Sequence, residues 1–109
     1  MRILILDISD IKHLCDLGVY RWTEHIISRM AKRNISRDDV KQALTSGEII
    51  EDYPDDYPYP SYLIYSKVSN NPIHVVCGID NDELWLITAY YPDLCEWYDD
   101  YRTRKEPAQ

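Results

Sequence analysis

The sequence predicts an α+β fold in which N-terminal helices pack on one face of a four-stranded antiparallel sheet and a short C-terminal helix follows. Two observations predict this. Apolar residues recur at helical spacing as far as Leu44, and from Glu48 onward short runs of β-branched and aromatic residues alternate with turn-forming residues. The 109 residues suit a single domain, 1–109, whose last residues, 105–109, are predicted to be a disordered tail.

Three helices are expected in the first half of the chain. Each has apolar residues on one side and a residue type that favours a helix end at its boundary. The first runs from Ile8 to Leu17 and stops at Gly18. Thr23 and Ser36 are the expected N-caps of the second and third helices, which end at Asn34 and Gly47.

The second half is expected to form strands joined by short turns, which implies antiparallel pairing. The predicted strands are Glu48 to Tyr53, Ser61 to Ser69, Ile73 to Ile79 and Leu84 to Tyr90. After Pro92, the residues Leu94, Trp97, Tyr98 and Tyr101 recur at helical spacing, so a last helix is expected over 93–101.

Charge is divided unevenly along the chain. Between Tyr20 and Thr45 there are six basic and three acidic residues, whereas Ser46 to Asp100 has Lys67 as its only Lys or Arg against twelve acidic residues. The basic half could meet phosphate or an acidic partner. The net charge of −7 argues against simple nonspecific binding of nucleic acid.

No window approaches the length of a membrane span, and the apolar run at the start is too short for a secretion signal, so a cytoplasmic protein without a membrane partner is expected. Three widely spaced cysteines, Cys15, Cys77 and Cys95, suggest neither a zinc site nor disulfides and are interpreted as small core residues. The chain contains no G-x-G-x-x-G motif and no P-loop, so no cofactor is predicted.

His25, Arg29 and Arg33 stand at i, i+4 and i+8 of the second helix and therefore project from one side. One interpretation is a clamp for phosphate or carboxylate, with His25 able to transfer a proton near neutral pH. The other, favoured by the residues alone, is a solvated or ion-paired helix face.

His74 is the second candidate, on the strand face opposite to Ile73, Val75 and Cys77. Two histidines, an arginine and a tyrosine suffice to cleave an RNA phosphodiester without a metal, because a base, an acid and a cation are all supplied. The alternative is that His74 only pairs across strands with a tyrosine or an aspartate.

Ten tyrosines and no phenylalanine indicate many half-exposed aromatic edges. Three of the tyrosines, Tyr53, Tyr57 and Tyr59, alternate with prolines in the stiff acidic tract from Gly47 to Ser61. Such a surface could stack nucleobases or contact a protein partner, and the neighbouring carboxylates favour the protein.

Four stretches, taken jointly and in order, resemble the uncharacterised domain family numbered 4258. They are H-I-I-S-R-M-A-K-R-N-I-S from His25, G-E-I-I-E-D-Y-P-D-D-Y-P-Y-P-S from Gly47, I-H-V-V from Ile73 and I-T-A-Y-Y-P-D-L-C-E-W from Ile87. The resemblance covers roughly Trp22 to Arg104. Its members are similar in size and element order to small toxins of the RelE and MqsR kind, which implies an RNA endonuclease neutralised by an antitoxin protein.

The resulting hypothesis is a metal-independent ribonuclease of the toxin and antitoxin type. His25 and His74 would be the acid and base, and Tyr90 a proton donor or a surface for base stacking. Phosphate would be bound by Arg29, Arg33 and Arg104. The alternative from another class is a noncatalytic module that binds a protein through Tyr53, Tyr57 and Tyr59.

Overall fold

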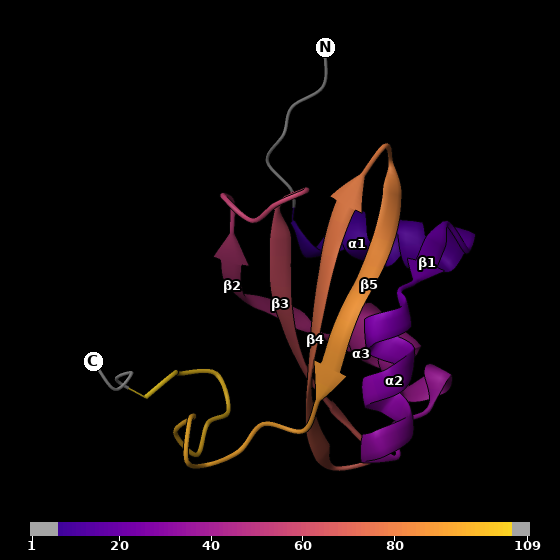
Figure 1. Cartoon of the computed structure of the whole chain (residues 1–109). Coiled ribbons are helices and arrows are strands. Elements are labelled where there is room, and N and C mark those ends of the chain that lie inside the picture. Colours follow the sequence, from indigo (N-terminus) through magenta and orange to yellow (C-terminus); the bar gives the residue numbers. More distant parts are fainter. Residues whose placement is uncertain (1–6, 106–109) are drawn as a thin grey trace.

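The computed structural model describes residues 7–105, which form three helices and a five-stranded sheet. The elements are α1 (Ile8–Leu17), β1 (Tyr20–Trp22), α2 (Glu24–Arg33), α3 (Arg37–Ser46), β2 (Glu48–Tyr53), β3 (Ser61–Val68), β4 (Asn71–Asp80) and β5 (Glu83–Tyr90). Figure 1 shows β2 to β5 side by side, with α2 next to β5. The predictions for the first apolar run up to residue 6 and for all of the predicted tail, 105–109, except Lys105 lie outside the described residues.

The three helices begin and end where the sequence predicts, because local capping decides their limits. The Thr23 hydroxyl accepts a hydrogen bond from the Ile26 amide, and Ser36 forms a capping box with Asp39. Gly18 ends α1 in the left-handed conformation, at a φ of 75°, which a side chain would disfavour. Helical periodicity and capping residues were therefore sufficient to predict the limits of the three helices.

The sheet differs from the prediction in one strand. Its order is β1-β5-β4-β3-β2, and β1 pairs parallel to β5 while the other pairs are antiparallel. The four strands predicted from the sequence are present, but the prediction of a purely antiparallel four-stranded sheet was wrong. With three residues, β1 is too short to show an alternating pattern, and it is held by its pairing with β5.

Beyond β1, helix α2 continues along the exposed edge of β5. The Thr23 hydroxyl donates to the Leu86 carbonyl at 2.9 Å, and an Arg33 guanidinium nitrogen, Nη1, donates to the Ala89 carbonyl at 3.0 Å. The Leu86 carbonyl also accepts from the Thr23 amide at 3.3 Å, so the N-cap and the last residue of α2 both bond carbonyls at this edge of β5. This contact fixes Arg33 next to the last residues of β5.

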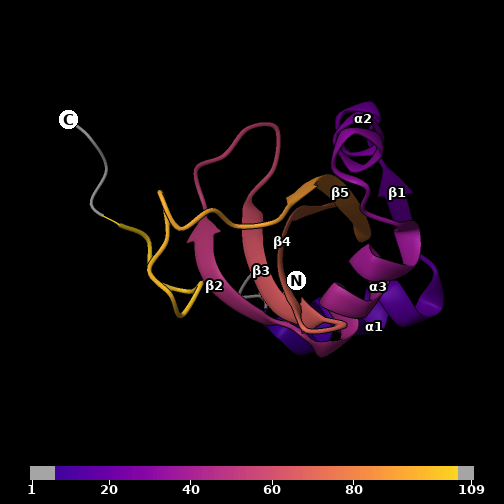
Figure 2. The ribbon, with the colours of Figure 1, turned by 90° about the horizontal axis from the view of Figure 1, so that it is seen from below.

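The hydrophobic core lies between the helices and one face of the sheet. Ile11, Ile26, Val40 and Leu44 from the helices pack with Ile64, Val75 and Leu86 from the strands. Figure 2 shows α1 and α3 on this side and the chain that follows β5 on the other. We call this other side the open face. Ile73 faces the core, so His74, which alternation places on the opposite face of β4, points to the open face.

Residues 91–105, which we call the C-terminal segment, do not form the predicted helix. One turn closes on Asp93, whose carbonyl accepts from the Glu96 and Trp97 amides at 2.9 and 3.0 Å. The chain then reverses, because Asp100 accepts from the Arg102 and Thr103 amides and Trp97 pairs with Arg104 in an antiparallel bridge. The helical spacing of Leu94, Trp97 and Tyr98 was therefore misleading.

The bridge in the C-terminal segment continues to its last described residue, where the Lys105 amide donates to the Glu96 carbonyl at 2.8 Å. Cys95 lies exposed on this segment, so its assignment to the core was wrong, whereas Cys15 and Cys77 are buried as predicted. No helix within residues 7–105 has the length and apolarity needed to cross a membrane.

Candidate functional site

His74 is the centre of a polar cluster on the open face. Its Nε2 lies 2.7 Å from the backbone carbonyl of Tyr101, and its Nδ1 lies 3.3 Å from the Tyr90 hydroxyl. A carbonyl only accepts, so Nε2 carries the proton. In the neutral ring, Nδ1 is then an acceptor, and the Tyr90 hydroxyl donates to it. The C-terminal segment therefore sets the tautomer of His74.

Aromatic rings enclose the imidazole and exclude water from it. The Trp97 ring lies edge-on to it at a centroid distance of 4.5 Å, and Tyr65 and Tyr90 stand on the neighbouring strands at 5.9 and 5.3 Å. His74 has no exposed surface. This burial lowers the pKa of His74 below its usual value, although the Tyr101 carbonyl opposes the shift. His74 is consequently neutral at pH 7.

Tyr90 connects this buried ring to the surface, since its own side chain is only half-buried. Burial raises the pKa of Tyr90, the positive charges of Arg104 and Arg33 oppose that shift, and the carboxylates of Glu51 and Glu96 add to it. The hydroxyl therefore stays protonated and has a cationic side chain from α2 and another from the C-terminal segment in its surroundings. Of the predicted catalytic and phosphate-binding residues, the structure brings together His74, Tyr90, Arg33 and Arg104.

Arg104 is held in place by Glu51 of β2. Its Nε and Nη2 bond the two carboxylate oxygens at 3.2 and 3.1 Å, and its guanidinium lies 4.5 Å from the centre of the Trp97 ring. Tyr53 donates from its hydroxyl to Glu51 as well. Burial raises the pKa of Glu51, but the bonds from Arg104 and Tyr53 outweigh burial and lower the net value. Tyr53 is thus part of this network.

The other two tyrosines predicted to bind a partner belong to the loop of residues 54–60. Tyr57 is 94% exposed, whereas Tyr59 stacks on Trp85 at a centroid distance of 5.9 Å. Tyr59 also lies over Gly78, where an added Cβ would collide with its ring. Within this loop, Tyr57 is presented to solvent while Tyr59 anchors the loop to the open face.

The basic side of α2 is divided between two places. Arg33 reaches the end of β5, whereas His25 is exposed and lies 3.5 Å from the Nε of Arg29. Eight residues of helix separate His25 from Arg33, about 12 Å along the axis at about 1.5 Å a residue. The structure therefore does not bring His25 next to His74.

Several groups of the cluster are absent from the sequence-based prediction. They are Glu51, Tyr65, Trp97 as a cover for His74, and the Tyr101 carbonyl. Tyr65 and His74 occupy open-face positions that alternation indicates, whereas Glu51 reaches the open face only because a β-bulge lies between Ile49 and Glu51. Strict alternation would place Glu51 on the core side with Ile49. The contributions of Trp97 and Tyr101 depend on how the C-terminal segment folds back, and no periodic signal in the sequence indicates that.

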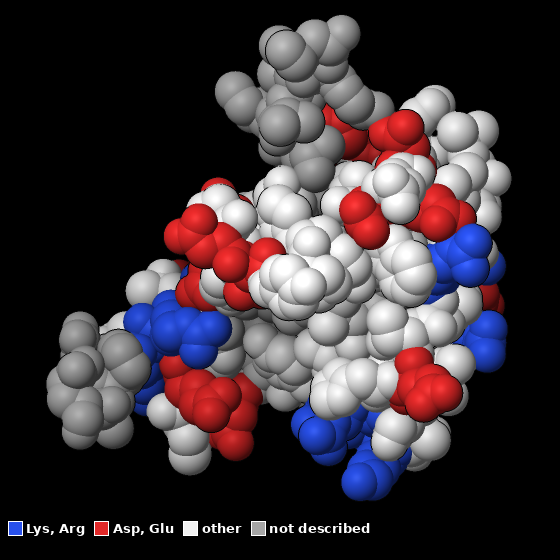
Figure 3. Space-filling model, turned by 45° about the horizontal axis from the view of Figure 1, so that its top comes forward, with Lys and Arg blue, Asp and Glu red and all other residues white. Residues whose placement is uncertain are grey.

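The surface around the site mixes both signs of charge. Figure 3, in which the top of Figure 1 comes forward, shows uncharged residues across the middle of the view and basic and acidic groups around its edge. This side shows no continuous basic tract, so an anionic ligand would be bound by a few defined groups. Among residues 7–105, no group of three or more His, Cys, Asp or Glu side chains is placed to hold a metal ion.

The fold and the cluster define a small α+β domain with a neutral histidine buried beneath its C-terminal segment. The family model described as a domain of unknown function (DUF4258) matches residues 22–91, more than half of the chain, and the chain belongs to this family. The match runs from the last residue of β1 to just past β5, so the predicted resemblance over 92–104 lies outside it. A search of curated proteins found no match.

Proposed function

We propose that the chain is a metal-independent endoribonuclease of the toxin and antitoxin type, with Tyr90 as its reacting side chain. The observation that carries the proposal is the hydrogen bond from the Tyr90 hydroxyl to a neutral, buried His74 whose other nitrogen is bonded to the Tyr101 carbonyl. A hydroxyl activated by a fixed imidazole is the arrangement that general acid and base catalysis requires.

In the proposed reaction, the proton of the RNA 2'-hydroxyl moves to the Tyr90 oxygen as the proton of Tyr90 moves to Nδ1 of His74. The 2'-oxygen forms a bond to phosphorus, and the bond from phosphorus to the 5'-oxygen breaks. The 5'-oxygen takes a proton from water. The hydroxide that remains is neutralised when His74 returns its proton through Tyr90, so the enzyme is regenerated and a 2',3'-cyclic phosphate is released.

The charge that develops on the phosphate oxygens would be stabilised by Arg33 and Arg104, whose positive charges already act on the Tyr90 hydroxyl. Arg104 is oriented by Glu51, and Arg33 by the Ala89 carbonyl. Arg29 and His25 extend the basic side of α2 away from Tyr90 and would meet a more distant part of the RNA. A protein antitoxin is the proposed partner, and the exposed Tyr57 offers it a contact.

The test is incubation of single-stranded RNA with the purified chain in the presence of a chelator. The wild-type protein should release fragments ending in 2',3'-cyclic phosphate. Tyr90→Phe, which keeps the ring and removes the hydroxyl, should lower the rate by about 100-fold or more. Tyr98→Phe makes the same change at an exposed tyrosine and should cleave normally. Equal activity of the two variants would refute the role of Tyr90.

A noncatalytic protein-binding module is the second candidate, and the 94% exposure of Tyr57 favours it. In that case one partner should be captured in stoichiometric amount from a lysate of the source cells, and Tyr57→Ala should abolish the capture while RNA remains uncut. Tyr59 is unsuitable for this test because it packs on Trp85. Cleavage of RNA by the wild-type chain would favour the ribonuclease over the noncatalytic binding module.

A further inference from the structure

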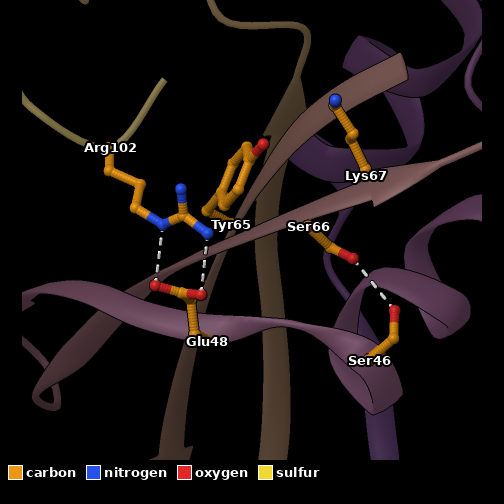
Figure 4. Close-up of a pocket in the computed structure, with 6 residues that line it drawn as sticks. All are labelled: Ser46, Glu48, Tyr65, Ser66, Lys67 and Arg102. Carbon is orange, nitrogen blue, oxygen red and sulfur yellow. Dashed lines mark hydrogen bonds and ion pairs between the residues drawn. The ribbon is translucent and has the colours of Figure 1, made fainter. Parts of the chain in front are cut away.

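A second potential site lies on the open face beside the His74 cluster. It is an open pocket of about 400 Å³ at the border of β2 and β3, and its lining residues are Ser46, Glu48, Tyr65, Ser66, Lys67 and Arg102. Figure 4 shows Lys67 from β3 and Arg102 from the C-terminal segment on either side of the Tyr65 ring. The pocket thus unites a helix end, two strands and the C-terminal segment.

The two cations of the pocket exceed its single acid. Lys67 is the only Lys or Arg between Ser46 and Asp100, and within residues 7–105 it makes no ion pair. Arg102 uses Nε and Nη2 to bond Glu48 at 2.9 and 3.1 Å, and its guanidinium lies 4.7 Å from the centre of the Tyr65 ring. Within the described part of the chain, its Nη1 makes no hydrogen bond and is left to donate to a ligand. In a chain of net charge −7, this pocket carries a local positive excess suited to one phosphate.

The two serines that line the pocket, Ser46 and Ser66, accept hydrogen bonds. The Ser46 hydroxyl donates to the Gln42 carbonyl at 2.7 Å, so in its 2.9 Å contact with Ser66 it is Ser66 that donates. Both hydroxyl protons are then used, and the remaining lone pairs can only accept. Hydroxyl acceptors next to two cations suit a ribonucleotide. Its phosphate would bind the cations, and its 2'-hydroxyl would donate a hydrogen bond to a serine oxygen.

The pocket is aligned with the proposed reaction site. Glu48, Tyr65, His74 and Tyr90 are successive partners in the sheet register, and they form one row across β2, β3, β4 and β5. Two strand spacings of about 4.8 Å place Tyr65 about 10 Å from Tyr90. A strand of RNA with its reacting phosphate at Tyr90 could therefore place a neighbouring nucleotide at Tyr65.

We infer that this pocket binds a ribonucleotide flanking the cleaved bond, with its phosphate between Lys67 and Arg102. The inference rests on the proposed function, because it assigns a second contact to the same RNA strand. Its test uses the Tyr90→Phe protein, in which RNA cleavage is expected to be about 100-fold or more slower than in the wild-type chain. Binding of a single-stranded RNA of about twelve nucleotides is measured by fluorescence anisotropy over a series of salt concentrations.

Adding Lys67→Met to that protein should weaken RNA binding roughly threefold to tenfold at about 0.1 M salt and reduce the salt slope by about 0.7, as expected for one lost phosphate contact. Lys12→Met, on α1 behind the sheet, should change neither quantity. Lys67 is exposed, so an unchanged melting temperature should show that Lys67→Met leaves the fold intact.

An unchanged slope in Lys67→Met, or no RNA binding at all, would overturn the inference. If the wild-type chain cleaves RNA while that slope is unchanged, the pocket assignment fails and the proposed function stands. If RNA is never cut but Lys67→Met still loses the contact, the pocket is an RNA-binding site and the catalytic proposal fails.

Discussion

His74 and Tyr90 face each other across β4 and β5, with the Tyr90 hydroxyl 3.3 Å from Nδ1 of the imidazole. One member of the pair is fully buried and the other is half-buried. A proton can therefore pass between the solvent side and a ring that water does not reach. The pair also links the sheet to the C-terminal segment, because the Tyr101 carbonyl holds the other ring nitrogen. The proposed chemistry and the docking of the C-terminal segment therefore both involve His74.

The first prediction concerns pH and stability. The folded-state pKa of His74 is lowered below 6.5, the ordinary value for a histidine, chiefly by burial. Above that value the ring is neutral in both states, and the stabilisation is complete. As pH falls below it, the unfolded chain takes up the proton first, so the free energy of unfolding decreases until the pH passes the folded-state pKa. The urea midpoint should therefore be lower at about pH 5.5 than at about pH 7.5.

The matched controls for this prediction are two histidine variants. His25→Gln removes an exposed histidine and should keep the full pH dependence of the wild-type chain, whereas His74→Gln should lose most of it. The carboxylates Glu48 and Glu51, whose pKa values are lowered, lose their contributions only at more acid pH. An equal fall of the midpoint in both variants would assign the effect to other groups.

The second prediction separates two arginines of α2. Arg33 is bonded to the Ala89 carbonyl, next to Tyr90 in the chain, whereas Arg29 contacts His25 about one turn away. If Arg33 stabilises the developing charge on phosphate, Arg33→Gln should lower kcat/KM by about 100-fold, and Arg29→Gln by about tenfold or less. The two variants are compared by their rates of cleavage of the same RNA at the same salt concentration. A larger loss of kcat/KM in Arg29→Gln than in Arg33→Gln would refute the proposed role of Arg33.

The third prediction concerns the attachment of the C-terminal segment. Trp97 has no exposed surface and packs on His74 and under Arg104. Trp97→Ala should weaken the docking of the C-terminal segment on the sheet by about 3–5 kcal/mol. Hydrogen exchange should accelerate at the Tyr98 and Lys105 amides, which bond the Thr103 and Glu96 carbonyls. Trp97→Phe should preserve most protection, and unchanged exchange in Trp97→Ala would show that other contacts hold the segment.

The helices could be predicted because the residues that begin and end each helix lie next to it in the sequence. Thr23, Ser36 and Gly18 act through neighbours within a few residues, so no knowledge of the rest of the fold is needed. β1 could not be predicted in this way, since its three residues are a strand only because β5 lies beside them. The helix expected over 93–101 failed for a related reason: the pairing of Trp97 with Arg104 replaces helical hydrogen bonds after one turn.

The candidate site shows the same division between local and distant information. Alternation along the strand placed His74 opposite to Ile73, and it also allowed the cross-strand contact with a tyrosine that is now seen with Tyr90. It could not show that His74 would be covered. That depends on Trp97 and the Tyr101 carbonyl, which return to β4 from more than twenty residues away along the chain. Contacts over such separations are fixed by the whole fold.

The last prediction concerns the loop of residues 54–60 and its anchor. A Cβ at Gly78 would meet the Tyr59 ring and, at 2.9 Å, the Pro60 carbonyl. Gly78→Ala should therefore push Tyr59 off Trp85 and destabilise the protein by about 1–3 kcal/mol. In a Tyr59→Ala background the ring is gone, so the same substitution should cost clearly less, and the two changes should be less than additive. Urea unfolding of the four proteins, followed by tryptophan fluorescence, measures this. Strict additivity would show that the strain arises at the Pro60 carbonyl and not at the ring.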